Sequence, residues 1–247
     1  MKTSKLPVLN KTNALNALIN AFAEELRGKG FEGDIHSDYA SRISSSMDNS
    51  VYFVVPELVV FPCNKNDVNR IFALASKKEY QELKFSPRGG GTGTSGHSLC
   101  AGVIVDTSRY MNNILEVDFD NEYVKVEPGV VLDQLNDTLA DSEYFFAPNL
   151  SPSNRATLGG MVNTDACGKG SRIYGRTSAH VLELECTLVN GQKLSTKKIK
   201  LSDLNENKLN DIEKNIYSTV VEQIIDKYEL TVSYTHLTLP TKPSGLM

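Results

Sequence analysis

The chain has 247 residues, which is enough for one large domain or two small ones with a packed core. Its formal net charge is −4, and no dense block of lysine and arginine is present, which argues against a nucleic-acid-binding surface. No apolar run approaches the ~20 residues of a membrane span, and the N-terminal sequence lacks the apolar segment of a signal peptide. We therefore expect a cytoplasmic protein.

The cysteines and histidines predict no metal site. The four cysteines are far apart and form no C-x-x-C motif, so neither a zinc site nor an iron–sulfur site is indicated, and we expect reduced thiols. The histidines share no metal-ligand spacing. These residues are Cys63, Cys100, Cys167 and Cys186, and His36, His97, His180 and His236.

Apolar residues at helical spacing predict three helices in the first 140 residues, and "NIYSTVVEQIIDKY", residues 215–228, reads as a further helix. The first covers residues 12–27 and ends near Gly28 and Gly30. The second follows Asn64, a candidate N-cap, and has Asp67 in its first turn. The third lies over residues 131–139.

Strand signals surround these helices. The segment "VYFVVPELVVFP", residues 51–62, predicts two short strands separated by Pro56, and further strands are expected near Phe85 and over residues 103–106. "NILEVDFDNEYVKVEPG" and "HVLELECTLVNGQKLST" read as antiparallel hairpins, the second with a type I′ turn at Asn190-Gly191. The expected class is α+β, with a small α/β subdomain at about 50–110 followed by a mainly antiparallel sheet subdomain with flanking helices at 111–231.

The stretch "SPRGGGTGTSGHS", residues 86–98, contains a literal G-x-G-x-x-G at Gly91, Gly93 and Gly96. A Rossmann unit requires a helix after this motif, but "HSLCAGVIVDTS" reads as a second strand, and no Lys-Ser or Lys-Thr pair completes a Walker motif. Glycines here would expose backbone N–H groups that suit a phosphate anion. The alternative is a tight solvent-exposed loop with no ligand.

Residues 147–181 hold five more glycines and few large apolar residues. A structureless segment of this length inside a compact domain is typical of a functional loop or of disorder. Two such loops indicate a long ligand lying between them.

Together, "PRGGGTGTSGHS" and "PNLSPSNRATLGGMVNTDACGKGSRIYG" closely resemble the FAD-binding domain of the vanillyl-alcohol oxidase / p-cresol methylhydroxylase (PCMH-type) superfamily. The nearest branch is that of the bacterial FAD-linked D-2-hydroxyglutarate and D-lactate dehydrogenases. The resemblance runs from about Ser50 to Lys193 and includes "VVPELVVFPCNKNDVNRI" and "GVIVDTSRYMNNILEVD". It implies the PCMH-type fold, with non-covalently bound FAD between two subdomains.

The resemblance also implies a set of cofactor-binding residues. The backbone of the first loop would wrap the FAD pyrophosphate, the second loop would line the ribityl chain and isoalloxazine, and one valine would lie near the adenosine half. The first-loop residues are Arg88, Gly89, Gly90, Gly91, Thr92, Gly93 and Thr94. The others are Pro148, Ser153, Thr157, Gly159, Gly160, Asn163, Gly168, Tyr174 and Gly175, with Val181 near the adenosine. Pro148 and Tyr174 could instead be packing residues, and Asn163 could cap a turn.

Three further side chains near these loops leave alternatives open. Some superfamily members attach FAD through a histidine, but the branch most similar to this chain does not, so His97 is expected to remain free. Arg155 and Arg176 could approach an acidic substrate or the phosphates, or could be solvated charges.

The implied function is the FAD-binding portion of a flavoprotein oxidoreductase that oxidises a D-2-hydroxy acid by hydride transfer to flavin. In the similar enzymes, the base and the carboxylate clamp lie in a C-terminal substrate domain, with iron–sulfur motifs in the larger members. No catalytic residue is assigned in this chain, and the electron acceptor is unidentified. The alternative is a stand-alone FAD-binding module without substrate chemistry.

Three divisions of the chain are expected: a helical extension over residues 1–49, the FAD-binding domain over 50–231, and a tail over 232–247. The tail "VSYTHLTLPTKPSGLM", which starts at 232, looks like translated sequencing-adapter sequence. We therefore expect a truncated enzyme with an artefactual tail; the alternative is a genuine proline-rich terminus.

Overall fold

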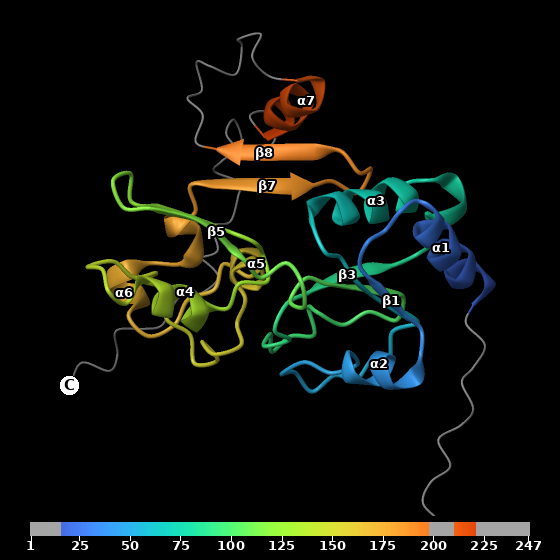
Figure 1. The fold of residues 1–247 in the computed structure, drawn as a ribbon, viewed down its shortest axis with the longest axis horizontal. Coiled ribbons are helices and arrows are strands. Elements are labelled where there is room, and N and C mark those ends of the chain that lie inside the picture. The colour runs from blue at the N-terminus through green and yellow to red at the C-terminus, as the bar shows by residue number, and fades with distance from the viewer. Residues whose placement is uncertain (1–15, 198–209, 221–247) are drawn as a thin grey trace, which may run out of the picture. The chain divides into compact units, whose positions relative to one another are not determined.

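A computed structural model describes residues 16–197 and 210–220 (Figure 1). The chain divides into two compact units, one made of Met1–Val181 with Thr187–Lys193 and the other of Leu182–Cys186 with Leu194–Met247. The domain boundaries expected at residues 49, 110 and 231 stay predictions. The predicted tail lies outside the described residues.

The first unit contains a mixed four-stranded sheet in the order β1-β2-β4-β3. Its strands are β1 (Asp34–His36), β2 (Leu58–Phe61), β3 (Phe85–Arg88) and β4 (Val103–Asp106). β1 runs antiparallel to β2, whereas β2, β4 and β3 are mutually parallel neighbours. The central strands β2 and β4 are buried at every residue, which explains their unbroken apolar sequences. β3 is an edge strand, so it tolerates Pro87, which has no N–H to donate.

Two helices cover one face of this sheet (Figure 1): α1 (Ala17–Gly28) and α3 (Lys65–Ala75). Successive strand residues point to opposite faces, and the residues of β2 and β4 divide between two core clusters accordingly. The Asn64 side chain accepts hydrogen bonds from the amides of Asn66 and Asp67, so the predicted N-cap is confirmed. α1 begins after its own cap, Asn16, and residues 12–15 of the predicted helix lie outside the described part.

The strand predicted before Pro56 is wrong. Residues 51–55 contain only an isolated bridge, between Met47 and Phe53, and Val51 is 95% exposed. They follow α2 (Tyr39–Ser44). The physical reason is that both sides of β2, the strand that follows in the chain, are already occupied by β1 and β4, so this apolar run cannot pair with it.

The second half of this unit has a separate core. β5 (Ile114–Asp118) and β6 (Tyr123–Val126) form the predicted antiparallel hairpin, and α4 (Leu132–Leu139) packs against it. The Asp118 carboxylate accepts a hydrogen bond from the Asn121 amide and closes the turn. These elements, with the mixed sheet, confirm the α+β class.

Residues 147–181 are not a structureless loop, which corrects the prediction. They contain α5 (Leu158–Asn163), α6 (Ser171–Tyr174) and a short 3-10 helix, Thr177–His180. Thr157 caps α5 by accepting a hydrogen bond from the Gly160 amide, and Met161 is almost completely buried. Tertiary packing therefore orders a glycine-rich sequence that has little helix propensity of its own.

The second unit contains most of β7 (Glu183–Thr187) and of β8 (Lys193–Lys197), together with α7 (Asp211–Val220), while the connection Thr187–Lys193 is assigned to the first unit. The predicted type I′ turn is wrong, because that turn needs positive φ at both central residues. Only Gly191 has it, at 78°, and its amide donates to the Leu188 carbonyl. This geometry is that of a three-residue loop with glycine in the left-handed position.

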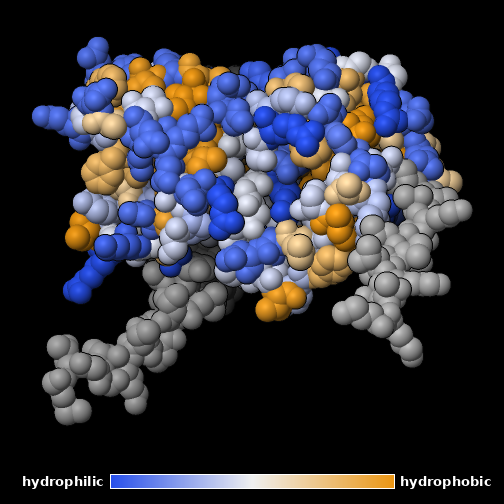
Figure 2. All heavy atoms as spheres, turned by 60° about the horizontal axis from the view of Figure 1, so that its bottom comes forward, coloured by the Kyte–Doolittle hydropathy of each residue, from blue (hydrophilic) through white to orange (hydrophobic). Residues whose placement is uncertain are grey.

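Hydrophobic and hydrophilic residues are interspersed on the face drawn in Figure 2. Within residues 16–197 and 210–220, no helix combines the length and the apolar character that crossing a membrane requires.

A buried carboxylate joins three segments of the first unit. Asp67 on α3 has a fully buried side chain that accepts hydrogen bonds from the amides of Glu32 (3.1 Å) and Cys63 (3.0 Å). Arg70 Nη1 donates to the same carboxylate at 2.8 Å. Asp67 therefore holds the segment before β1 and the end of β2 against the start of α3.

We expect Asp67→Ala to lower the free energy of unfolding by about 2–4 kcal/mol, because it leaves two amides without their acceptor and removes one of the two carboxylates that pair with Arg70. Chemical denaturation measures the change. Asp137→Ala, at an exposed position of α4, is the control and should stay within about 0.5 kcal/mol of the unchanged protein. Equal effects of the two substitutions would contradict this assignment.

Candidate functional site

The first glycine cluster is the connection between two parallel neighbouring strands. β3 ends at Arg88 and β4 begins at Val103, so residues 89–102 must return the chain from one end of the sheet to the other. Such crossovers usually contain a helix. Here the second half of the connection runs back along β3, because Ser86 Oγ donates to the His97 carbonyl (2.9 Å) and Cys100 Sγ to the Lys84 carbonyl (3.5 Å).

The first half of the connection, residues 89–95, lies at the carboxyl end of the sheet. We call it the glycine loop. Among the residues that the structure describes, no partner accepts a hydrogen bond from any of its seven consecutive backbone amides. Open α/β sheets bind ligands at this edge. A row of unpaired N–H groups in a turn is the arrangement that binds an anion without lysine side chains.

Two glycines of this connection adopt backbone angles that only glycine accepts readily. Gly91 has φ +61° and Gly96 has φ +75°. Gly93 has an ordinary φ, and a Cβ added there would meet only the His97 ring, 3.0 Å from Nδ1. Of the glycines in the loop, Gly93 is therefore the one where a larger side chain would disturb the protein least.

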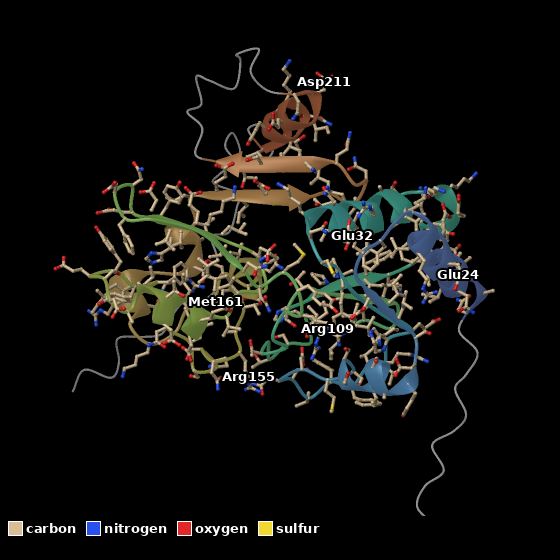
Figure 3. The ribbon with its side chains drawn as sticks, in the orientation of Figure 1. Glu24, Glu32, Arg109, Arg155, Met161 and Asp211 are labelled. Atoms are coloured by element: carbon tan, nitrogen blue, oxygen red, sulfur yellow. The ribbon has the colours of Figure 1, made fainter. Side chains whose placement is uncertain are left out.

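Gly89 and Gly90 bring the two predicted loops into contact. A Cβ on Gly89 would lie 2.0 Å from Thr157 Oγ1, and one on Gly90 would lie 1.9 Å from the carbonyl oxygen of Arg155. Neither approach is possible for a residue with a side chain. Figure 3 labels Arg155, whose carbonyl makes this contact, and Met161 in α5. The two glycine-rich segments thus form a single packed region of the first unit.

Several predicted residues of the second segment have structural partners. Pro148 is buried, and the Ser153 carbonyl accepts a hydrogen bond from the Asp133 amide. Gly159 lies against Pro128, where an added Cβ would be 2.7 Å from the proline Cβ. Gly168 packs more closely still, with an added Cβ 1.9 Å from the Asn149 carbonyl oxygen. These four residues shape the segment, and their contact with a ligand stays a prediction.

The remaining predicted residues are more accessible. Asn163 ends α5 with an exposed side chain, and Tyr174 is 44% exposed with its ring edge-on to Phe145. Gly175 follows with φ +78°, and Val181 closes the segment with its amide donating to Ser178. Within residues 16–197, no hydrogen bond or ring contact joins Tyr174 to the glycine loop.

One residue that matters to the second segment was not predicted from the sequence. Asp165 has φ +44°, in the left-handed region, and its carboxylate accepts a hydrogen bond from the Ser178 amide at 3.0 Å. That bond holds the pKa of Asp165 below its usual value. Aspartate tolerates the left-handed conformation and favours turns, so Asp165, three residues before Gly168, could have been recognised from the sequence as a turn residue.

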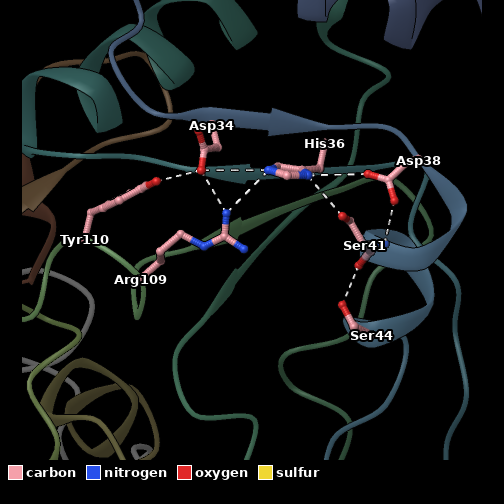
Figure 4. A network of polar contacts seen from close by, with 7 residues as sticks. All are labelled: Asp34, His36, Asp38, Ser41, Ser44, Arg109 and Tyr110. Carbon is pink, nitrogen blue, oxygen red and sulfur yellow. Dashed lines mark hydrogen bonds and ion pairs between the residues drawn. The ribbon is translucent and has the colours of Figure 1, made fainter.

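A polar cluster lies outside the glycine loop and joins β1 to the segment after β4 (Figure 4). Arg109 Nη1 and the Tyr110 hydroxyl donate to Asp34 at 2.8 and 2.7 Å, and together they lower the pKa of this carboxyl group. At the other side of the His36 ring, Asp38 accepts from the Ser41 amide, which lowers its pKa to about 2. The cluster is satisfied internally and holds β1 in place.

A shallow hollow of about 580 Å³ lies beside α4 and contains no predicted cofactor-binding residue. Its lining residues are Val131, Asp133, Gln134, Asp137, Thr138 and Asn154. Among the described residues, no group of three or more histidine, cysteine or carboxylate side chains is arranged to hold a metal ion. The glycine loop and its neighbour therefore remain the candidate site.

Comparison with known proteins matches residues 56–197 to the family described as FAD binding domain. D-2-hydroxyglutarate dehydrogenase of Haemophilus influenzae is 45% identical over 226 residues, which cover 90% of this chain and 22% of that protein. The enzyme of the same name from Pseudomonas putida is 50% identical over 183 residues, covering 74% and 18%. The chain thus spans only about a fifth of these relatives.

Among solved structures, alkyldihydroxyacetonephosphate synthase has a TM-score of 0.65 at 21% identity and covers 87% of this chain and 40% of its own. A BBE-like protein of Physcomitrella patens has a TM-score of 0.62 at 19% identity, with 76% and 39% covered. These likenesses confirm the predicted fold.

We expect Gly90→Ala to destabilise the protein by about 1–3 kcal/mol, the usual cost of overpacking, because its Cβ would overlap the Arg155 carbonyl. The matched control is Gly28→Ala, where an added Cβ meets nothing within 4 Å. That substitution should leave stability unchanged or raise it by up to about 1 kcal/mol. Thermal unfolding compares the two, and an unaffected Gly90→Ala variant would show that the two segments are not packed together.

Proposed function

The chain belongs to the FAD-binding domain family, and from that premise we propose that its glycine loop binds the pyrophosphate of FAD. The observation that carries this proposal is the row of seven backbone amides, residues 89–95, that have no acceptor among the described residues. The pyrophosphate supplies negatively charged oxygens that accept hydrogen bonds. Hydrogen bonds to charged groups are stronger than those between neutral groups.

The loop has the chemistry that a dinucleotide pyrophosphate needs. Gly91 gives the turn a left-handed backbone angle, Gly93 presents its main chain without a branched side chain, and the Thr92 and Thr94 hydroxyls add donors. Loop amides carry only partial charges, so affinity depends on how many of them converge on one anion. Seven consecutive amides in one turn favour this convergence.

We assign the flavin end of the cofactor to the accessible residues of the second segment. The Asn163 side chain carries both a donor and an acceptor, and Tyr174 offers an aromatic face beside Gly175. The exposure of Asn163 and Tyr174 supports a ligand-facing role, whereas the buried Pro148 fits packing. FAD, when bound, supplies a two-electron acceptor; this chain's residues bind it and fix its orientation.

We propose that the protein to which this domain belongs oxidises a D-2-hydroxy acid, with D-2-hydroxyglutarate as the first substrate to test. The two dehydrogenases compared above support this substrate by their names. D-lactate is the second substrate of the same class. The base that removes the hydroxyl proton is not assigned to a described residue, and the electron acceptor and the expected cytoplasmic location stay part of the proposal.

We expect Gly93→Val to reduce FAD binding by the purified chain at least tenfold, because the added methyl groups would occupy the position of a phosphate oxygen. Equilibrium dialysis or flavin fluorescence measures the dissociation constant. Far-UV circular dichroism checks that the fold persists.

His97 provides the control for this experiment, since the three atoms nearest to an added Cβ at Gly93 all belong to its ring. His97→Ala alone should keep FAD, and the Gly93→Val loss should persist in the His97→Ala background. Recovery of binding in the double variant would show that Gly93→Val acts by displacing His97, and the loop would then not be the phosphate site. Flavin retained on acid-precipitated wild-type chain would indicate a covalent His97 link.

We expect the FAD-loaded chain by itself to leave the flavin oxidised during anaerobic mixing with D-2-hydroxyglutarate or D-lactate. Hydride transfer requires substrate held in near-attack geometry, a contribution of ~7–11 kcal/mol, and proton abstraction adds ~10²–10⁴-fold in rate. A protein of the relatives' length that contains this domain should bleach the 450 nm absorbance with its own substrate. Prompt bleaching by the 247-residue chain would overturn the prediction, and no bleaching by the longer protein would favour a stand-alone FAD-binding module.

A further inference from the structure

The side chain of Arg88 joins three segments beneath the glycine loop. Arg88 is the last residue of β3, and its side chain is only 12% exposed. Nη2 donates to the Met47 carbonyl at 2.8 Å and Nη1 donates to Ser98 Oγ at 3.2 Å. On the sheet side, Nε lies 3.9 Å from Asp106 Oδ2, because Arg88 and Asp106 are register partners at the ends of β3 and β4.

This guanidinium lies behind the loop. A Cβ added at Gly91 would be 2.6 Å from Nη2, so the guanidinium fills the space that a side chain there would need. Its two terminal nitrogens already donate to protein acceptors. Arg88 is therefore placed to act on an anion through the loop backbone, by fixing it, rather than as a direct ligand.

Two carboxylates share this cation. Asp106 is nearly buried and also accepts hydrogen bonds from the amide and hydroxyl of Ser108. Asp48 accepts from Ser98 Oγ at 3.3 Å, and Ser98 in turn accepts from Arg88. Burial lowers the pKa of Arg88, whereas the charges of Asp106 and Asp48 raise it. Without the arginine, two negative charges would remain directly behind an anion-binding loop.

We propose that Arg88 is the positioning residue of the glycine loop: it ties the loop to the Met47–Asp48 segment and partly neutralises the Asp48 and Asp106 carboxylates behind it. An anion on residues 89–95 then meets oriented amides with one net negative charge at their back instead of two. The identity of that anion as a pyrophosphate rests on the proposed function, whereas the connection to Met47 and Ser98 does not.

The first experiment tests positioning without flavin. Amide hydrogen exchange is followed at four amides that do have acceptors, namely Ser46, Ser50, Val54 and Leu99. Arg88→Met should raise their exchange rates at least tenfold, and Arg88→Lys should raise them less. Arg42→Met is the matched control, since Arg42 also ties a loop by donating to a main-chain carbonyl, that of Pro56. Unchanged exchange in Arg88→Met, or an equal change at these amides in Arg42→Met, would overturn the positioning role.

The second experiment tests charge balance by FAD titration of the same chains. Arg88→Met should weaken binding by about 10–100-fold, Arg88→Lys by less, and Arg42→Met by no more than about threefold. Arg88→Met combined with Asp106→Asn should recover part of the loss, because one of the uncompensated charges is gone. A purely structural role predicts no such recovery, so its absence would overturn the charge balance.

The two experiments separate this inference from the proposed function. If the wild-type chain binds no FAD, the proposed function fails and so does the electrostatic half of the inference. The exchange experiment then still decides whether Arg88 holds the Met47–Asp48 segment and the returning half of the connection in place.

Discussion

The site depends on one topological constraint: β3 and β4 are parallel neighbours whose connection contains no helix. A helix would satisfy its own amides, but residues 89–95 turn at the end of the sheet, and no acceptor within residues 16–197 and 210–220 pairs with their amides. The returning half of the connection is held to β3 through Ser86 and Cys100, so the turn cannot collapse onto the strand. The capacity to bind an anion therefore arises at backbone amides for which the described residues offer no acceptor.

The glycines of the two loops serve different physical purposes. Gly89, Gly90, Gly159 and Gly168 stand where another backbone or side chain comes too close for a Cβ, and thereby join the loops to each other and to their surroundings. Gly91 and Gly96 provide left-handed backbone angles, while Gly93 has neither constraint. The loops therefore owe their shape to packing within the protein, and a ligand meets a surface that is already organised.

Sequence patterns correctly predicted those elements that depend on contacts between residues close together in the chain. Asn64 capped α3 as expected, and the alternating residues of β5 and β6 formed the expected hairpin, because caps and periodicity act within a few residues. Three features depended on distant contacts and were missed. Residues 51–55 could not pair with β2, the turn at Gly191 took one left-handed residue instead of two, and α5 formed in spite of its two glycines because it packs in a core.

The candidate site was predictable to a similar degree. Glycine spacing indicated the loop and its chemistry, since unpaired amides follow from a turn that no helix continues. The contact between Gly90 and the Arg155 carbonyl joins residues 65 positions apart, and the hydrogen bond from Arg88 to Met47 joins residues 41 positions apart. The hydrogen bond from Arg88 to Ser98 is more local, but it ends in a loop of irregular backbone. No periodicity encodes such pairs, so only the three-dimensional arrangement reveals them.

Pro87 has a consequence for how this domain behaves in a crowded solution. It lies in β3, the edge strand that leads into the glycine loop. Exposed strand edges recruit strands from other molecules, and proteins protect them with proline, charge or short length. A four-residue strand with a proline in third place offers a poor template for such recruitment. The lateral edge of β3, beside the loop that must stay open to a ligand, is thus protected against intermolecular β-pairing.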